Sequence, residues 1–378
     1  MRQWTFPAIL KYYQTMTSQL KDRLIFLADK YENATFPDAD PCQFLHWYDA
    51  DRDGVANVEC AAFIAAMLAF GNRKQFIPKI QEILERAGEW ATQFQGDRPE
   101  GKTSAPVCKC SAPVSQGPAP VAKTPAPECQ VTATAGQSLA PECQSLSPAP
   151  RPSLVSYLQA DAPNFPHGSQ KFYRFYSYDD LHQLFAELAQ VTRTYGSLGN
   201  AVQKIQEGKV FPSLQPAARA DASVRLSSAT PSSGGHPRNA PAPSSQPDPT
   251  TTSFPSATPT PDLATALSSL FPKSAIVPKG KSSANKRIHM FLRWMVRRNS
   301  PVDLGLWTWA NPADLLIPLD VHVMEEAVTL GLLPPTARSN HKTAVELTKI
   351  LAKVFPGDPA RGDFALFGLG VDKVDKGF

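Results

Sequence analysis

Two long proline-rich stretches limit what this chain can fold into more than any other feature of its sequence. They cover about residues 94–160, with Pro, Ala, Ser and Gln, and about residues 208–260, with Pro, Ser and Thr. The 378-residue chain holds 37 prolines, and many of them fall in these two stretches. Such composition cannot bury enough apolar surface to offset the entropy of the chain. We therefore expect two disordered linkers that divide the chain into three foldable segments.

The three segments between the linkers all have helical patterns. The first, 1–93, holds the apolar run Cys60–Asn72, which we expect to be a buried helix, followed by an amphipathic helix over Lys74–Trp90. The second, 161–207, is aromatic and helical, and the third, 261–378, has the longest helical patterns. Because the second segment is too short to fold alone, we expect it to pack with the other two. The predicted fold class is all-α.

The overall charge and hydropathy exclude several classes of protein. The formal net charge is only +4, so any binding of nucleic acid must rest on a local cluster of charge. No apolar run approaches the ~20 residues of a membrane span, and the N-terminus lacks the apolar core and cleavage site of a signal peptide. We expect a cytoplasmic protein that does not contact a membrane.

Two short stretches invite a metal-site interpretation, and neither supports it. The sequence DADRDGVANVEC (Asp49–Cys60) matches the first half of a calcium loop, but Cys60 stands where the loop needs a bidentate carboxylate. We expect a polar turn whose aspartates cap a helix beginning near Val55. Cys108 and Cys110 are too isolated for a zinc site and are expected to be free thiols of the first linker. The prediction is no metal and no cofactor.

A strongly basic stretch runs from Lys273 to Arg298. It holds eight basic residues and no acidic one: Lys273, Lys279, Lys281, Lys286, Arg287, Arg293, Arg297 and Arg298. This charge density fits contact with phosphate groups. The alternative is a helix face that is simply solvated.

A helix beginning at Lys286 would gather the charge on one face. Lys286, Arg293 and Arg297 recur at helical spacing, whereas Ile288 and its apolar neighbours form the opposite, core-facing stripe. Lys286 would stand in the first turn, where backbone amides are free to hold a phosphate. A lysine held near other cations and partly desolvated can act as an amine nucleophile on a sugar carbon.

The carboxylate of Asp320 lies within the mainly apolar run Leu315–Leu333, directly after Ile-Pro-Leu. It can be a helix N-cap, or it can stabilise the positive charge that develops as a glycosidic bond breaks. The two roles are compatible because a helix N-terminus stabilises an anion. The sequence alone does not place Asp320 beside Lys286.

Several blocks of sequence resemble a known superfamily. The residues IPLDVHV (Ile317–Val323) resemble the catalytic-aspartate motif of the helix-hairpin-helix DNA glycosylases, nearest to the 8-oxoguanine DNA glycosylases. The blocks Phe63–Ile77, Lys286–Trp307 and Asp363–Val371 resemble an uncharacterised bacterial family, a domain of unknown function, within that superfamily. The resemblance covers the three foldable segments and leaves both linkers out.

The resemblance implies a helix-hairpin-helix glycosylase fold interrupted by two insertions, with a lysine and an aspartate in the active site. These fall on Lys286 and Asp320, and Lys281 is the alternative nucleophile. Two features depart from the pattern. The usual Leu-Pro-Gly-Val-Gly hairpin is replaced by Ile276–Ser283, and the iron–sulfur loop of one branch is missing because no cysteine follows Cys143.

The function implied is a monomeric DNA repair glycosylase, with AP-lyase activity, that excises a damaged base such as 8-oxoguanine from double-stranded DNA. The DNA-contacting residues expected beside this site are Lys279, Lys281, Arg287, Arg293, Arg297, Arg298, Asn72 and Arg73. For Asn72 and Arg73 the alternative is a helix C-cap and a surface charge. Two other functions stay open: a non-catalytic nucleic-acid-binding protein of the same fold, and a scaffold whose proline-rich linkers recruit partners.

Overall fold

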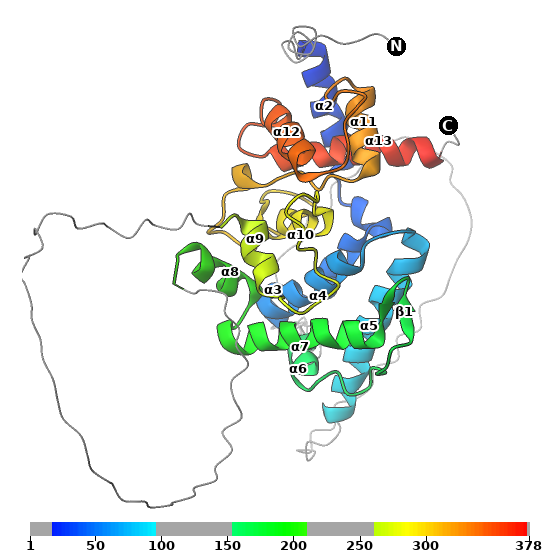
Figure 1. The fold of residues 1–378 in the computed structure, drawn as a ribbon, viewed down its shortest axis with the longest axis vertical. Helices are drawn as coiled ribbons and strands as arrows, with labels where there is room; N and C mark the ends of the chain where they lie inside the picture. Colours follow the sequence, from blue (N-terminus) through cyan, green and yellow to red (C-terminus); the bar gives the residue numbers. More distant parts are fainter. Residues whose placement is uncertain (1–16, 96–152, 210–260, 376–378) are drawn as a thin grey trace, which may run out of the picture.

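The computed structural model describes residues 17–95, 153–209 and 261–375, and within them the chain is mostly helical (Figure 1). The α-helices are α2 (Ser18–Tyr31), α3 (Ala50–Asp53), α4 (Val55–Leu68), α5 (Arg73–Gln95), α6 (Leu154–Gln159), α7 (Tyr178–Tyr195), α8 (Leu198–Gln206), α9 (Leu263–Ser269), α10 (Lys286–Val296), α11 (Val321–Thr329), α12 (His341–Leu351) and α13 (Gly362–Asp375). The 3₁₀ helices are η1 (Phe36–Ala39), η2 (Pro41–Trp47), η3 (Pro312–Asp314) and η4 (Pro359–Arg361). The two strands are β1 (Lys171–Tyr173) and β2 (Tyr176–Ser177), paired antiparallel. Most of both predicted linkers, with Cys108 and Cys110, lies outside the described residues.

Helix α4 is the centre of the larger core. Its residues from Asn57 to Leu68 are all buried, and it packs against α5, α6, α8, α10 and η2. The helix begins at Val55, as predicted from the aspartate-rich stretch, and ends at Leu68, before the predicted end of the apolar run Cys60–Asn72. Gly71 has a φ of +82°, which turns the chain, and the Asn72 side chain then accepts a bond from the Lys74 amide at the start of α5. Asn72 therefore caps the following helix and not the end of α4.

The middle segment differs from its prediction in two places. The β1–β2 hairpin interrupts the expected helices, and helix α6 lies inside the range that was expected to be linker. Helix α6 is ordered because Leu154, Tyr157 and Leu158 are buried against α4, α5 and α7. The expected linker over 94–160 is thus too long at its C-terminal end.

A second, smaller core lies at one end of the molecule, where the N-terminal helix α2 meets the C-terminal helices (Figure 1). Helices α2, α11, α12 and α13 meet there, with α13 packed against both α2 and α11 (Figure 1). Buried residues of this core include Leu24, Val323, Leu347 and Leu366. Helix α10 packs on α4 in the larger core, and its first turn points toward the smaller one. The two cores therefore meet at the N-terminus of α10.

The aspartate-rich stretch forms a turn, as expected, but its caps serve a different helix. Asp49 accepts bonds from the amides of Asp51 and Arg52 and caps the short helix α3, whereas α4 begins after Gly54 without a side-chain cap. Glu59 turns away from this loop into the core. Its carboxylate accepts bonds from the Leu198 amide at the start of α8 and from Trp307 Nε1 at 2.8 Å.

Within the described part of the chain, no helix is long and apolar enough to cross a membrane. The same residues contain no group of three or more His, Cys, Asp or Glu side chains that could hold a metal ion.

Candidate functional site

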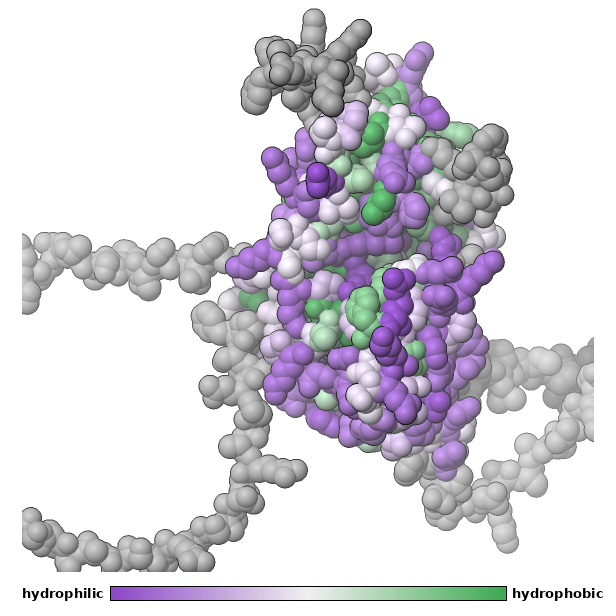
Figure 2. Space-filling model, turned by 45° about the vertical axis from the view of Figure 1, so that its right-hand side comes forward, coloured by the Kyte–Doolittle hydropathy of each residue, from purple (hydrophilic) through white to green (hydrophobic). Residues whose placement is uncertain are grey.

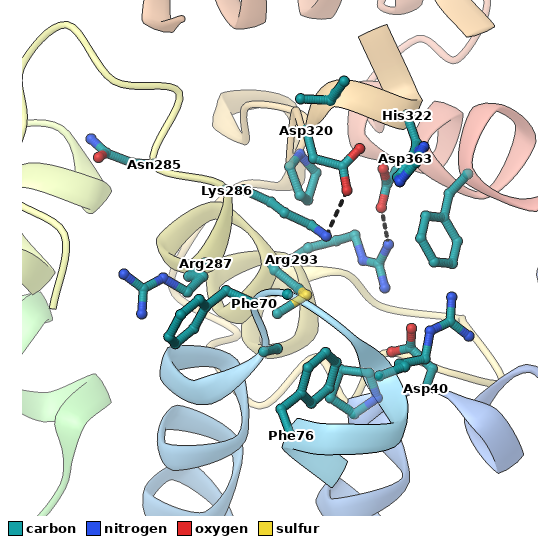
Figure 3. Close-up of a pocket in the computed structure, with 18 of the residues that line it drawn as sticks. Asp40, Phe70, Phe76, Asn285, Lys286, Arg287, Arg293, Asp320, His322 and Asp363 are labelled. Atoms are coloured by element: carbon teal, nitrogen blue, oxygen red, sulfur yellow. Dashed lines mark hydrogen bonds and ion pairs between the residues drawn. The ribbon is translucent and has the colours of Figure 1, made fainter. Parts of the chain in front are cut away.

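A pocket of about 580 Å³ lies where the two cores meet (Figure 3). Its walls come from η1 and η2, the α4–α5 turn, the N-termini of α10 and α11, and α13. The aromatic side chains that line it are Phe36, Phe70, Phe76 and Phe367, and the acidic ones are Asp40, Asp320 and Asp363. Apolar walls with a few charged groups are typical of a site for a small molecule or a nucleobase.

Lys286 and Asp320 meet in this pocket. Lys286 Nζ lies 2.8 Å from Asp320 Oδ2, and the two side chains are 31% and 20% exposed. Lys286 is the first residue of α10, and Asp320 immediately precedes α11, so each is presented by the N-terminus of a helix. The structure brings together the two residues that the resemblance assigned to catalysis, although 34 positions separate them in the chain.

Asp320 is also the N-cap of α11. Its Oδ1 accepts a bond from the Val323 amide at 2.9 Å, while Oδ2 faces Lys286. Burial acts to raise the pKa of Asp320, but the charge of Lys286, the bonds from Lys286 and Val323, and the charge of His322 outweigh it. The pKa of this carboxyl therefore lies below its ordinary value, and the site holds a carboxylate.

The rest of the pocket surrounds the Lys286 amine with aromatic and charged groups. Lys286 Nζ lies 5.9 Å from the centre of the Phe367 ring, and the Arg73 guanidinium lies 5.3 Å from the same ring. Arg73 thus belongs to the pocket wall, and Asn72 lies beside it at the start of α5. His322 is 70% exposed at the rim, near Glu325, so it is not a buried base.

Arg293 and Arg297 are buried in ion pairs, whereas they were predicted to contact DNA from a basic face of α10. Both side chains are about 2–3% exposed, because other parts of the chain cover that face. Arg293 bonds Asp303 and Asp363, and Arg297 bonds Asp303, Asp358 and Glu32. Buried charges need such partners, and here four carboxylates supply them.

This buried ion-pair cluster fixes α10 against the smaller core. Arg297 contacts Glu32, which directly follows α2, and Arg361 of η4 donates to the same carboxylate at 2.8 Å. Asp363, at the start of α13, joins the cluster to the pocket wall. Burial raises the pKa of Asp363 to about 6, with Asp320 and Asp303 adding to the effect and Arg293 and Lys286 opposing it.

The remaining basic residues divide between partly buried and exposed positions. Arg287 donates to the carbonyl of Met67 at the end of α4, and its guanidinium lies 5.0 Å from the Phe70 ring, so it forms part of the pocket wall. Lys279, Lys281 and Arg298 are exposed. Lys281 lines a different cavity, of about 640 Å³ beside α9 and α12, and is not among the residues that line the pocket of Asp320. Of the two predicted nucleophiles, only Lys286 reaches the pocket of Asp320.

Sequence reasoning missed two acidic residues of the pocket. Asp40 carries no local signal, because its side chain caps η2 through the Cys42 amide, as many turn aspartates do. Asp363 begins the block Asp363–Val371, so its place in a family motif was visible from the sequence. Its contact with Arg293 was not, because 70 positions separate the two residues in the chain.

Comparison with known proteins gives a family and nothing finer. No match was found among curated proteins, and none among solved structures. A family model described as "Protein of unknown function (DUF2400)" matches residues 40–108 and 250–372, just over half of the chain, and its second range includes Lys286, Asp320 and Asp363. The chain belongs to this family, DUF2400.

Proposed function

We propose that this protein is a DNA repair glycosylase with AP-lyase activity, built on a helix-hairpin-helix glycosylase fold. The observation that carries the proposal is the contact between Lys286 and Asp320, 2.8 Å apart in a pocket lined by aromatic side chains. An amine and a carboxylate at that distance are the two groups that this reaction needs. The resemblance of Ile317–Val323 to the catalytic-aspartate motif supports the same assignment.

The chemistry assigns one task to each residue. A damaged base leaves the duplex and enters the pocket, which places C1′ of its sugar beside Lys286. The Lys286 ammonium gives up one proton, which reaches the departing base, and the amine attacks C1′ and forms a C–N bond. The glycosidic bond breaks as this bond forms, and its electron pair leaves with the base. The C1′–O4′ bond of the sugar then breaks, O4′ takes up a proton from the attached nitrogen, and a protonated Schiff base remains on Lys286.

Asp320 has a second task during this step. Positive charge develops at C1′ as the glycosidic bond lengthens, and a nearby carboxylate stabilises that charge. The low pKa of Asp320 supports this role, because the group is an anion at neutral pH. Because the N-terminus of α11 holds the carboxylate in place, Asp320 does not have to move during the reaction.

The size and walls of the pocket support a base as its occupant. About 580 Å³ lies within the usual range for ligand pockets, and Phe70, Phe76 and Phe367 offer faces for stacking. The exposed cations Lys279, Lys281 and Arg298 are left to hold the DNA backbone. An oxidised purine such as 8-oxoguanine is the base implied by the resemblance.

The test is to trap the Schiff base. The protein is incubated with duplexes that carry one 8-oxoguanine, uracil or abasic site, and borohydride is added. We expect a covalent adduct with the wild type, its loss in Lys286→Gln, and its retention in Lys281→Gln, a matched exposed lysine outside the pocket.

The other outcomes each identify a different reaction. Base release without an adduct would mean that water is the nucleophile, that Asp320 is still needed for the reaction, and that Lys286 is not the nucleophile. Tight DNA binding with neither an adduct nor base release would favour the non-catalytic nucleic-acid-binding alternative. Loss of the adduct in Lys281→Gln alone would reject the assignment of Lys286.

A further inference from the structure

The tip of the β1–β2 hairpin has two features that oppose folding. Tyr173 pairs with Tyr176, so Arg174 and Phe175 form the two-residue turn. Arg174 has a φ of +53°, in the left-handed region where Gly, Asn or Asp is usual. Phe175 is 63% exposed and is one of four large hydrophobic side chains exposed on the described residues. A strained turn that displays an aromatic ring points to a function for that ring.

The hairpin is attached to the wall of the pocket. The Tyr173 hydroxyl donates to the Phe70 carbonyl at 2.5 Å, and Arg287 donates to the Tyr176 hydroxyl at 3.3 Å. Phe70 and Arg287 both line the pocket and lie together on one side of it (Figure 3). The Phe175 ring lies 5.3 Å from the Phe70 ring. The exposed ring is therefore held one side chain away from the pocket.

The glycine in the adjoining turn shows how close this attachment is. Gly71 follows Phe70, and a Cβ atom there would lie 2.9 Å from the Tyr173 hydroxyl and closer still to the Arg174 guanidinium. Side chains of the hairpin therefore lie directly against the backbone of the α4–α5 turn. Phe175 has a fixed position relative to the pocket.

The Phe70 ring, which Phe175 contacts, has cationic surroundings. The Arg174 and Arg287 guanidiniums lie 5.7 and 5.0 Å from the Phe70 ring, and the Arg174 side chain is exposed. The face of the molecule in Figure 2 is largely hydrophilic, with only small apolar patches. A single exposed ring next to this cationic group is too small for a stable protein interface but matches a nucleobase beside its phosphate.

We propose that Phe175, carried by the β1–β2 hairpin, stacks on a nucleobase of the DNA next to the one that occupies the pocket. Arg174 lies beside the ring and contacts the neighbouring phosphate. The choice of DNA as the partner rests on the proposed function, but the stacking contact requires no bond to be broken. It adds a binding contact on the α4 side of the pocket, opposite the carboxylate of Asp320.

The test measures binding to a duplex with a single tetrahydrofuran abasic analogue, which cannot form a Schiff base. One stacked base is worth about 5- to 150-fold in affinity on replacement by alanine. We expect a loss of that order for Phe175→Ala and near-wild-type binding for Phe175→Trp. Phe26→Ala is the matched control, because Phe26 is 66% exposed on α2 at the other end of the molecule, and it should bind like the wild type.

Salt dependence separates stacking from charge. Phe175→Ala should leave the slope of log affinity against log salt unchanged, whereas Arg174→Ala should reduce it by about one phosphate contact. Unchanged affinity in Phe175→Ala, or an equal loss in Phe26→Ala, would overturn the proposal and leave the ring as a contact for another class of partner. Borohydride trapping on the same variants tests the chemistry separately. An adduct together with unchanged DNA affinity in Phe175→Ala rejects only the stacking contact. A loss of affinity in Phe175→Ala without any adduct rejects only the glycosylase.

Discussion

Two substitutions at Asp320 separate its structural role from its chemical one. The carboxylate accepts a bond from the Val323 amide through Oδ1 and pairs with Lys286 through Oδ2. Asp320→Asn keeps an oxygen for the Val323 amide and removes the negative charge. Asp320→Ala removes both, so the difference between the two variants isolates the helix cap.

The structure sets the size of each effect. The two side chains of the pair are 31% and 20% exposed, so solvent screens their attraction. The ion pair, together with the interaction of the carboxylate with the N-terminus of α11, contributes about 1 kcal/mol to the free energy of unfolding. Loss of an aspartate cap costs about 1 kcal/mol more. We therefore expect the free energy of unfolding to fall by about 1 kcal/mol in Asp320→Asn and about 2 kcal/mol in Asp320→Ala.

The pH dependence of the first effect has a definite sign. The folded-state pKa of Asp320 is below the ordinary value of 3.8, so the charge contributes stability above about pH 4. That contribution is lost as the pH falls through the folded-state pKa. The gap in stability between the wild type and Asp320→Asn should accordingly close at low pH.

The assay combines urea unfolding with borohydride trapping and base release on the same preparations. Both variants should lose about 10²- to 10⁴-fold in the rate of base release, because neither has a carboxylate beside Lys286. If Asp320→Asn released base at the wild-type rate while Asp320→Ala only lost stability, Asp320 would be a helix cap and nothing more.

Two further predictions concern the packing that supports the site. Burial lowers the pKa of His289 to about 4, so unfolding takes up a proton between about pH 6.5 and pH 4, and the wild type should lose about 3 kcal/mol of stability over that window. Urea unfolding at pH 7 and pH 4.5 should show a smaller loss of stability in His289→Gln, and equal losses in the two proteins would contradict the reasoning. In Gly199→Ala the new Cβ would lie 2.6 Å from Trp307 Nε1 and 2.8 Å from Glu59 Oε1, so thermal unfolding should show a loss of about 1–3 kcal/mol in stability. The control Gly88→Ala, whose Cβ has nothing within 4 Å, should gain about 1 kcal/mol in stability, and equal behaviour of the two variants would refute this packing account.

Local features of the fold were within reach of the sequence. The helix that begins at Lys286 and the cap at Asp320 depend on interactions within four residues, which periodicity and capping rules describe. The buried character of α4 follows from its unbroken apolar composition. Its C-terminal end was less well predicted, because Gly71 and Asn72 act in the turn to the next helix.

The prediction for Arg293 and Arg297 failed because it relied on one helix alone. Helical spacing places both residues on the face of Lys286, but spacing cannot show that Glu32, Asp358 and Asp363 close over that face. A basic stripe therefore became the centre of a buried ion-pair cluster. Only the outlying cations, such as Arg298 and Lys279, remain exposed.

Local sequence patterns were enough to predict the helical class, the residues that begin α10 and α11, and a lysine and an aspartate that could carry chemistry. The packing of distant segments brings Lys286 to Asp320, puts Lys281 at another cavity, and places the hairpin tip beside the pocket. The physical reason is the range of the forces involved: caps and periodicity act within a turn, whereas a site forms where distant segments bury their apolar faces together and bring their polar ends into contact.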